Sequence, residues 1–357
     1  MNSAIETQQT RQKRYSKLKI TASILTLFGI GLFGYLVYAI GFREIYDGVL
    51  RFGVVGFAVI LFIYFVRILV RSYAWKLSVH EPYHLDMKDT IPAVVIGEAM
   101  SSTIPLGILI SGTSKAVAVR RRIPLVAGLS SVATENLFYS FITGLYLIAS
   151  AVVLVLGFAI DPNLLIAVNL MIATLGVATV LGIFMVIRQW HFASAICDWI
   201  YRKGFLTKLL ENGRAQVRLF EDLIYGFYRR HPRRFIPVCL LEAAYHLLGV
   251  VEVWYILSRL NDANAGFMTA LLLESVNRLV IIIFKLIPFS IGVDEAGAQF
   301  VGQTVALAAG VGVTLAIIRK GRALFWTAIG WALIAKRGLS FKDISQANSN
   351  VSSDQLV

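Results

Sequence analysis

Charged residues are scarce in this chain of 357 residues: Asp, Glu, Lys and Arg together make up 15%, against 57% hydrophobic residues. With so few charges, no stretch has the composition of a separate soluble domain. Long apolar runs recur along the whole length, and runs of 18 or more residues are typical of transmembrane helices. The sequence therefore predicts an all-α, polytopic membrane helix bundle.

Cysteine is nearly absent as well. The two cysteines, Cys197 and Cys239, fall in a predicted cytosolic segment and in a predicted span, respectively. They provide neither a disulfide framework nor the spacing of a metal site. His80 and His84 have helical spacing, but Pro82 lies between them and disfavours a metal pair. We therefore expect no metal and no other cofactor.

The common catalytic signatures are missing too. The chain has no Walker loop, no His-Glu-x-x-His motif and no Gly-x-Ser-x-Gly elbow, so we expect neither ATP hydrolysis nor another enzyme activity. Basic residues outnumber acidic ones by 34 to 21. They cluster in short loops, as the positive-inside rule predicts, and this distribution argues against nucleic acid as a partner.

Six full spans are predicted from the apolar runs. They are Ile20–Ile40, Phe52–Trp75, Pro124–Ile160, Leu164–Ile187, Phe235–Leu257 and Val311–Ala335. Basic residues precede the first run, but no clear cleavage site follows it, so we expect an uncleaved first helix. The loop from Arg43 to Arg51 is near neutral and suits the outside, whereas Arg67, Arg71 and Lys76 mark a return to the cytosol. Charge bias and span count together predict a multi-pass protein of the cytoplasmic (inner) membrane with both termini in the cytosol.

Two segments, residues 88–119 and 267–310, interrupt this pattern with prolines, glycines and charges at the depth where the chain should be most apolar. Proline breaks a helix, and non-helical backbone at membrane depth must be covered by protein or line a water-filled cavity. We therefore predict two re-entrant hairpins, the first entering from the cytosol and the second from outside. The expected hairpin breakers are Pro105, Gly112, Pro288 and Gly292.

The two membrane halves, residues 20–187 and 235–337, then form an inverted repeat, an arrangement used for alternating access. If Phe267–Ile287 and Phe289–Gly310 both span the membrane, the alternative is eight or more full spans. The remaining segments are a basic cytosolic N-terminus (1–19), a cytosolic amphipathic linker (188–234) and a disordered tail (338–357). In the linker, Val217, Phe220, Leu223, Ile224 and Phe227 recur at helical spacing. That helix either binds anionic lipid headgroups on the inner leaflet or joins the two halves.

Ionisable side chains of both signs occur at membrane depth, where a charge costs about 2.5–3.5 kcal/mol on insertion scales. The candidates for a substrate-binding site or translocation path are Glu98, Lys115, Glu135, Glu274, Arg278, Asp294, Glu295 and Arg319. Glu274 and Arg278 are four residues apart and can form an ion pair, which could be structural or functional. Glu242 and His246 have the same spacing and could relay protons or form a packed, hydrogen-bonded pair.

In an inverted repeat, the span with Glu135 corresponds to the span with Arg319, so we expect both residues at one central cavity. Lys320 and Arg322 lie close to Arg319 in the sequence. Arginine matches phosphate with a bidentate fork, and helix starts after Gly112 and Gly292 would add free N–H groups. This combination is typical of a site for an anionic lipid headgroup.

At these segments the chain resembles the flippase-like transmembrane family, which includes the membrane region of lysylphosphatidylglycerol synthase and of the multiple peptide resistance factor. The resemblance covers about Ile20 to Arg337. It is carried by Gly97-Glu98, Pro105 with Gly112 and Lys115, Glu135, Pro288 to Gly297, and the Arg319 helix. The family's second motif usually reads Gly-x-Gly-x-Arg-Glu-Gly. The chain has Ser-Ile-Gly-Val-Asp-Glu-Ala-Gly from Ser290 to Gly297, with Glu295 kept and Asp294 at the usual Arg position.

The resemblance implies an inner-membrane protein that moves or binds lipids. In larger relatives a separate soluble domain transfers an aminoacyl group from charged tRNA, and this chain has no room for that domain, so we expect no synthase activity. We predict translocation of an anionic or glycosylated lipid, with a membrane phospholipid or lipid-linked glycan as partner. The alternatives are a scaffold that holds a lipid-modifying enzyme, and a transferase that acts on lipid-linked substrates with Glu135 or Glu295 as base.

Overall fold

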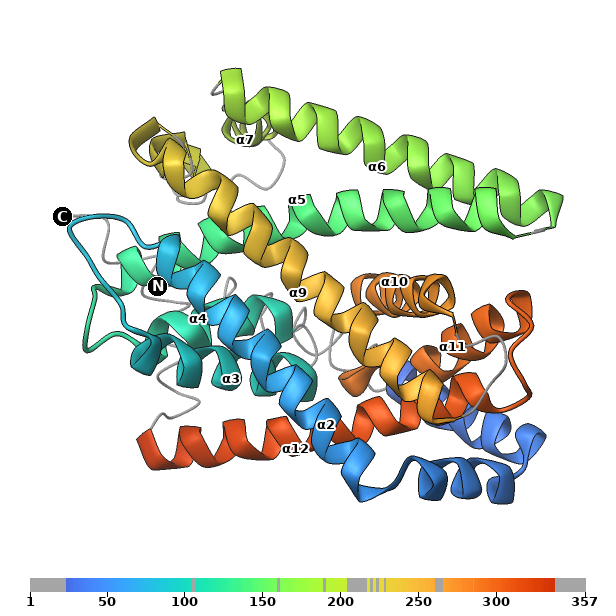
Figure 1. The fold of residues 1–357 in the computed structure, drawn as a ribbon. Coiled ribbons are helices and arrows are strands. Elements are labelled where there is room, and N and C mark those ends of the chain that lie inside the picture. Colours follow the sequence, from blue (N-terminus) through green and yellow to red (C-terminus); the bar gives the residue numbers. More distant parts are fainter. Residues whose placement is uncertain are drawn as a thin grey trace, which may run out of the picture. The chain divides into compact units, whose positions relative to one another are not determined.

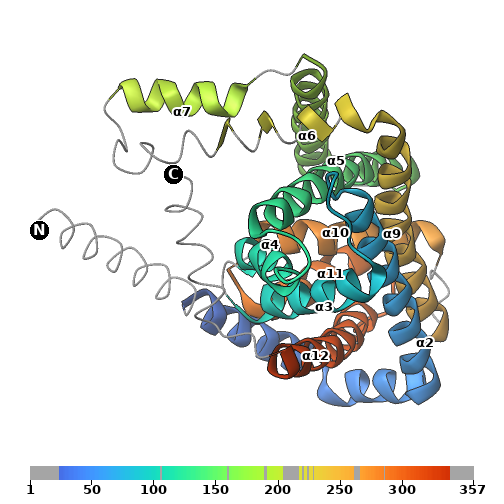
Figure 2. The same cartoon turned by 90° about the vertical axis from the view of Figure 1, so that its left-hand side faces the viewer.

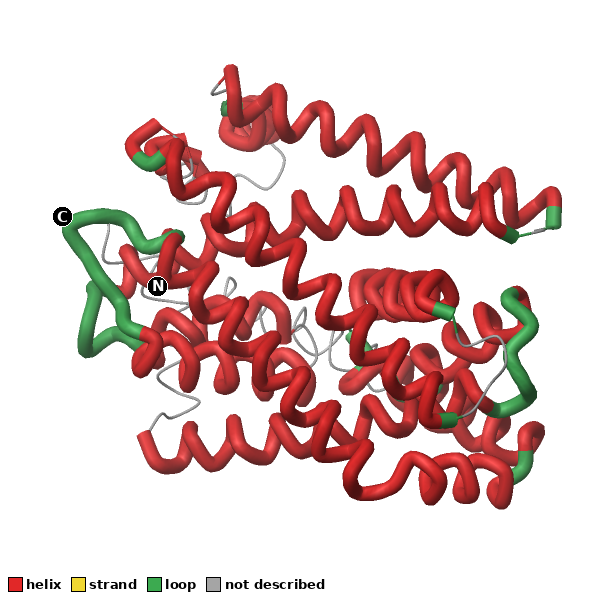
Figure 3. Tube along the Cα trace, viewed as in Figure 1, coloured by secondary structure: helices red, strands yellow, loops and turns green. Residues whose placement is uncertain are grey.

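The computed structural model describes residues 24–104, 107–158, 161–188, 191–203, 217–218, 221–222, 225–227, 229–260, 266–284 and 286–337. Within these residues every regular element is a helix, and short loops join the helices (Figure 3). The protein is an all-α polytopic membrane helix bundle, as the apolar runs predict. The predicted N-terminal segment 1–19 and the predicted tail 338–357 lie outside the described residues.

Among the described residues, four helices are long and apolar enough to cross a membrane: α2 (Phe42–Leu77), α5 (Leu125–Gly157), α6 (Pro162–Arg188) and α9 (Pro232–Arg259). They coincide with four of the six predicted spans. The first predicted span appears as a shorter apolar helix, Ile24–Ile40. The last, α12 (Val311–Arg337), has 27 residues but carries Arg319, Lys320 and Arg322 along its length. Helices α5 and α6 lie side by side as an antiparallel pair (Figure 1).

The predicted loop before the second span is in fact helical. Helix α2 begins at Phe42 rather than at Phe52, and the chain turns at Gly53, whose backbone has φ 67° and ψ 172° (Figure 1). Glycine adopts a positive φ without the steric cost that a Cβ would impose. The stretch from Arg43 to Arg51 is therefore a short helix that ends at a glycine turn.

The first broken segment consists of helices α3 (Met87–Thr103) and α4 (Gly107–Ala118). The chain enters α3 and leaves α4 at the same end, so the two helices form a hairpin (Figures 1 and 2). They pack closely, since a Cβ built at Gly97 would lie 2.8 Å from Lys115 Cγ. Pro105, the predicted breaker, lies outside the described residues.

Gly112 does not break this segment, because it lies inside α4. A glycine inside a helix costs only about 1 kcal/mol relative to alanine, which the surrounding packing can offset. Here the missing side chain lets α4 approach α5: a Cβ at Gly112 would lie 3.3 Å from Val132 Cγ1. Gly128 of α5 allows the same close approach of the two helices, because a Cβ at Gly128 would lie 3.3 Å from the Cβ of Ala116 in α4.

The second broken segment consists of α10 (Phe267–Ile283), a 3-10 turn η1 (Pro288–Ser290) and α11 (Val293–Thr304). Helix α11 begins directly after Gly292, which has φ 81°. Helices α10 and α11 pack side by side, with Gly297 against Val280 (Figure 1). With 12 residues, α11 is about 18 Å long, shorter than the ~30 Å hydrocarbon core. This length argues against the alternative in which both parts of the segment are full spans.

The same order of elements therefore occurs twice. A long helix, a helix of 17 residues, a helix of 12 residues and another long helix follow one another as α2 to α5 and again as α9 to α12. This order is what an internal repeat requires. The inverted orientation of its two copies stays a prediction.

Contacts divide the chain into two compact units. The first unit comprises Met1–Leu61, Ala99–Leu109 and Val253–Thr327, and the second comprises Phe62–Glu98, Ile110–Glu252 and Ala328–Val357. The pair α10–α11 belongs to the first unit. Most of the pair α3–α4 belongs to the second, whose apolar core includes Phe138, Phe227 and Val238.

The linker between the halves contains the amphipathic helix α7 (Phe192–Arg202), which runs crosswise to α6 (Figures 1 and 2). Trp199 is exposed on α7. The stretch predicted as amphipathic lies further along. Its Phe227 is 1% exposed and packs edge-on against Phe138, so it contacts the protein core. Phe220, Leu223 and Ile224 of that stretch lie outside the described residues.

Candidate functional site

Glu135 is a completely buried carboxylate in the first third of α5. Arg71 of α2 donates from Nε to its Oε1 at 3.0 Å, and Lys115 of α4 donates from Nζ to its Oε2 at 3.3 Å. The small residues Gly112 and Gly128 allow α4 to lie close enough to α5 for this contact. One carboxylate thus bridges two cations inside the second unit; we call these three residues the Glu135 cluster.

Aromatic rings surround the two cations of the Glu135 cluster. The Arg71 guanidinium lies 4.5 Å from the centre of the Tyr139 ring and 5.4 Å from that of Tyr245. Lys115 Nζ lies 5.8 Å from the centre of the Trp75 ring. Such contacts stabilise a cation by about 0.5–2 kcal/mol, more strongly where water is excluded. The rings therefore offset part of the cost of burying the two positive charges.

A second buried ion pair lies in the same unit. Arg67 Nη1 donates to Glu252 Oε2 at 3.1 Å, and each of the two side chains is 1% exposed. The Arg67 guanidinium also lies 4.4 Å from the centre of the Tyr245 ring. Glu98 of α3 accepts a hydrogen bond from Tyr64 at 3.0 Å. Tyr245 thus connects this pair with the Glu135 cluster, because both arginines stack on its ring.

Glu274 has the corresponding role in the first unit, where it is completely buried in α10. Its Oε1 accepts from Arg278 Nε at 3.0 Å and from Arg278 Nη2 at 2.7 Å, which is the ion pair predicted from their spacing. Its Oε2 accepts from Arg319 Nη2 of α12 at 2.6 Å. Again one carboxylate bridges two cations; we call these three residues the Glu274 cluster.

Polar groups extend the Glu274 cluster toward α11. With its amide oriented to satisfy both partners, Asn277 donates to Asp294 Oδ1 at 2.9 Å and accepts from Arg319 Nη2 at 2.6 Å. Lys320 Nζ lies 2.7 Å from Glu295 Oε1 and 3.6 Å from Asp294 Oδ2. These contacts tie α10, α11 and α12 together.

Glu295 also caps α11. Its Oε2 accepts from the backbone N–H of Gly292 at 2.8 Å, as in a capping box. The N–H group of Gly292 at this helix start, which the sequence suggests as a phosphate donor, therefore already has a carboxylate partner.

The structure divides the predicted path residues between the two units. Glu98, Lys115 and Glu135 lie in the second unit, whereas Glu274, Arg278, Asp294, Glu295 and Arg319 lie in the first. Glu135 and Arg319 each have partners within their own unit. That both face one central cavity stays a prediction.

Sequence reasoning missed Arg71 and Asn277. Arg71 follows Arg67 by four residues within an apolar helix, and this helical spacing could have placed both on one inward face. The prediction that Arg67 and Arg71 mark the cytosolic end of the second span is incomplete, because both side chains form ion pairs with buried carboxylates. Asn277 lies one residue before Arg278, and nothing in the local sequence distinguishes it.

The predicted relay residues lie together on α9, next to α5. His246 Nε2 lies 3.0 Å from Thr143 Oγ1, and the imidazole stacks between Tyr139 and Tyr146, with ring centres 5.4 and 4.9 Å away. Glu242 is completely buried. In the part of the chain that the structure describes, neither of its oxygens has a hydrogen-bond partner. A Glu242–His246 hydrogen bond, one interpretation of their spacing, is therefore not formed.

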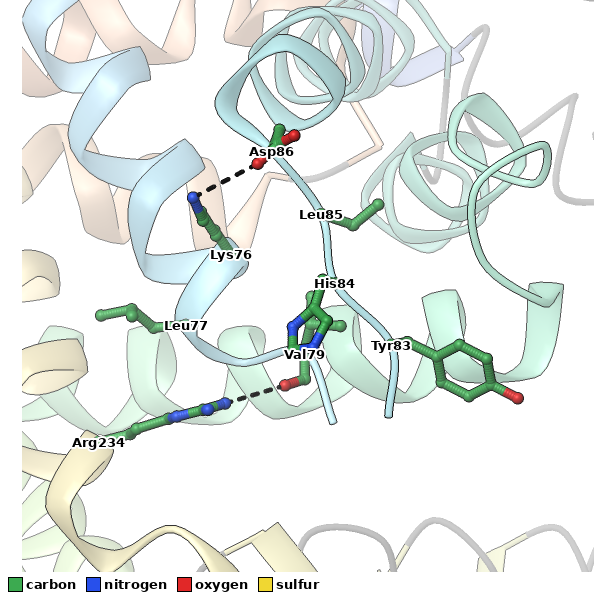
Figure 4. Close-up of a pocket in the computed structure, with 8 residues that line it drawn as sticks. All are labelled: Lys76, Leu77, Val79, Tyr83, His84, Leu85, Asp86 and Arg234. Atoms are coloured by element: carbon green, nitrogen blue, oxygen red, sulfur yellow. Dashed lines mark hydrogen bonds and ion pairs between the residues drawn. The ribbon is translucent and has the colours of Figure 1, made fainter. Parts of the chain in front are cut away.

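One cavity, of about 310 Å³, lies where the loop after α2 meets the start of α9 (Figure 4). Lys76 and Asp86 form an ion pair at 3.7 Å beside it, and Arg234 donates to the Val79 carbonyl at 3.3 Å (Figure 4). None of the predicted path residues lines this cavity. Across the described residues, no group of three or more His, Cys, Asp or Glu side chains could hold a metal ion.

Comparison with known proteins agrees with this architecture. No curated protein and no solved structure matches the chain. A family model described as the lysylphosphatidylglycerol synthase TM region matches residues 20–330, a span that contains both broken segments and both bridging glutamates. The chain therefore belongs to the family of the lysylphosphatidylglycerol synthase transmembrane region.

Proposed function

We propose that this protein translocates an anionic lipid between the leaflets of the cytoplasmic membrane. One observation carries the proposal: in each unit, a fully buried glutamate bridges two cations beside a broken helix pair. Ionisable residues at membrane depth are expensive and usually mark a substrate or ion pathway. Two such clusters, on elements that occur twice, support a transport function more strongly than a purely structural one.

The chemistry of the clusters favours a phosphate-bearing headgroup. A phosphodiester presents oxygens that can replace a bridging carboxylate between two cations, and arginine binds it through a bidentate fork. During such an exchange the two cations keep a countercharge, so neither of them is left as an uncompensated buried charge, which would cost about 3–5 kcal/mol. A phosphate can therefore displace Glu135 or Glu274 without leaving Arg71 or Arg319 unpaired.

In this mechanism the headgroup binds at the buried clusters within the protein, while the acyl chains stay in the bilayer. The short helices beside each break supply polar groups at membrane depth, as discontinuous helices do in transporters. Neither ATP hydrolysis nor covalent chemistry takes part, and a phospholipid or lipid-linked glycan is the substrate.

The test measures lipid movement in liposomes that contain the purified protein and labelled phosphatidylglycerol. Arg319→Gln is the informative variant, because Glu274 keeps Arg278 as its countercharge. Arg43→Gln is the matched control, since Arg43 is exposed. We expect wild-type protein and Arg43→Gln to expose inner-leaflet lipid to a membrane-impermeant quencher, and Arg319→Gln to fall to the rate of protein-free liposomes.

Two outcomes contradict the proposal: no acceleration by the wild-type protein, or unchanged acceleration by a folded Arg319→Gln variant. Mass spectrometry of the recovered lipid distinguishes a transferase, which would leave a chemically altered product. A stable partner enzyme that co-purifies, in the absence of transport, would instead indicate a scaffold.

A further inference from the structure

Glu242, the acidic member of the predicted relay pair, differs from the residues of the predicted path. It lies inside α9, is 0% exposed, and neither carboxylate oxygen has a hydrogen-bond partner among the described residues. An ionised carboxylate in that position would lose its hydration without compensation, at a cost of several kcal/mol. A protonated carboxylic acid avoids most of this cost. Glu242 is therefore buried as the neutral acid.

The groups that face Glu242 come from four helices. They are Arg71 of α2, Lys115 of α4, Glu135 of α5 and Cys239 of α9, each of which interacts electrostatically with Glu242. Glu242 interacts electrostatically with all three members of the Glu135 cluster. Both cations of that cluster already hydrogen-bond to Glu135. Two carboxyl groups, Glu135 and Glu242, thus lie near these two cations, but only Glu135 hydrogen-bonds to them.

The two carboxyl groups make the cluster sensitive to a proton. Ionised, Glu242 would compete with Glu135 for Arg71 and would repel an anionic headgroup. When Glu242 is protonated, both cations stay paired with Glu135 or with the phosphate that replaces Glu135. Binding of an anionic headgroup and protonation of Glu242 therefore favour each other, which is the requirement for coupled transport.

We propose that Glu242 is a proton-binding site that couples lipid movement to proton movement, so that a proton travels with each anionic lipid. This inference rests on the proposed function, because it names the ion that drives it. The substrate class is an anionic phospholipid together with H⁺.

His246 is placed to deliver the proton. Thr143 donates its hydroxyl hydrogen to the Tyr139 carbonyl at 2.7 Å, so its oxygen can only accept from His246 Nε2. The Nε2 atom therefore carries the hydrogen, and Nδ1 is the atom that takes up and releases a proton. His246 lies one helical turn from Glu242 but does not hydrogen-bond to it, so a proton released from Nδ1 would pass to the Glu242 carboxylate through one water.

The first test applies a pH gradient across the liposomes with labelled phosphatidylglycerol. Glu242→Gln is the informative variant, since glutamine resembles the protonated acid in shape and charge. Glu44→Gln makes the same chemical change at an exposed carboxylate. We expect the gradient to drive lipid accumulation by wild-type protein and Glu44→Gln, while Glu242→Gln equilibrates lipid with no response to the gradient. A gradient response that persists in Glu242→Gln overturns the inference.

A second test reads protonation directly and does not depend on transport. Infrared difference spectra of the purified protein at neutral pH should contain the carbonyl stretch of a buried carboxylic acid, and Glu242→Gln should lose that band. Identical spectra overturn the inference. If wild-type protein moves lipid without responding to a gradient, coupling fails and the proposed function stands. If it moves no lipid, the proposed function fails and the infrared result alone decides the state of Glu242.

Discussion

At the residue scale, Glu135 and Glu274 show how a membrane protein keeps several charges away from water. Each is completely buried, and each bridges two cations that come from different helices. Removing one member of a buried ion pair is more damaging than replacing the whole pair, because the remaining charge loses its partner. The two glutamates should therefore control stability as well as function.

Glu135→Gln should lower the free energy of unfolding by about 3–5 kcal/mol, because Arg71 and Lys115 lose their shared countercharge. Thermal or denaturant unfolding in detergent measures this loss. Glu44→Gln is the control, since Glu44 is exposed and its neutralisation should change stability by less than about 0.5 kcal/mol. Equal stability of the two variants would contradict a bridging role for Glu135.

His80, in the loop after α2, should make stability depend on pH. Burial against Phe227, and then the positive charges of His231, Arg230 and Arg234, lower the pKa of His80. The unfolded chain therefore binds a proton, with a pKa of about 6.5, before the folded protein does. This site leaves stability unaffected above that pH, and stability falls as the pH drops through the lower folded-state pKa. In the His80→Gln variant, the free energy of unfolding should decline less between pH 8 and pH 5 than in the wild type. An unchanged decline would exclude His80 as the source of the pH dependence.

At the element scale, the break between α10 and α11 depends on backbone geometry. Phe289 and Ser290 have φ values of 53° and 48°, and Gly292 has φ 81°. A Cβ at Gly292 would overlap the carbonyl oxygen of Gly29, so this glycine also permits a close approach of the helix at Ile24–Ile40. The break is therefore held in place by packing as well as by Pro288.

Gly292→Ala should destabilise the protein by more than about 1–2 kcal/mol, because alanine disfavours the left-handed region and its Cβ has no room. Gly176→Ala is a matched control in α6, where no atom lies within 4 Å of the added Cβ. That change should raise stability by about 0.5–1 kcal/mol through helix propensity. A melting temperature below that of the wild type for Gly292→Ala and above it for Gly176→Ala would support this account. A Gly292→Ala variant as stable as the wild type would contradict it.

At the scale of the whole molecule, the repeated order of elements constrains the topology. Helices α2 to α5 and α9 to α12 follow the same sequence of long, short, short and long. If each short pair is a hairpin and each long helix crosses once, the chain crosses the membrane six times, counting α6 and the helix at Ile24–Ile40. Even numbers of crossings place both termini on one side.

Cysteine labelling tests this topology in a background without Cys197 and Cys239. Asp161 is exposed in the loop between α5 and α6, so Asp161→Cys should react with a membrane-impermeant maleimide in intact cells. Glu81→Cys, between α2 and α3, should react only after permeabilisation, because the predicted orientation, with a cytosolic N-terminus, places that loop in the cytosol. The reverse pattern would overturn the orientation, and labelling of both from outside would overturn the span count.

Local patterns predicted much of this architecture. Proline and glycine positions located the second break, and the four-residue spacing of Glu274 and Arg278 predicted their ion pair, because both effects act within one helical turn. Gly112 shows the limit of such reasoning: glycine precedes the start of α11 at position 292 but packs inside α4 at position 112, and only the neighbouring Val132 accounts for the second case.

The sequence by itself determined the membrane class, the helical content, the family and the residue types at membrane depth, since hydrophobicity and helix breaking are properties of short segments. Only the tertiary structure decided which charges meet. Arg71 lies 64 residues from Glu135, and Arg319 lies 45 residues from Glu274. Their pairing depends on how α2, α4 and α5, and likewise α10 and α12, pack against one another. Packing also isolated Glu242 from every hydrogen-bond donor among the described residues, and this isolation makes it the proposed proton site.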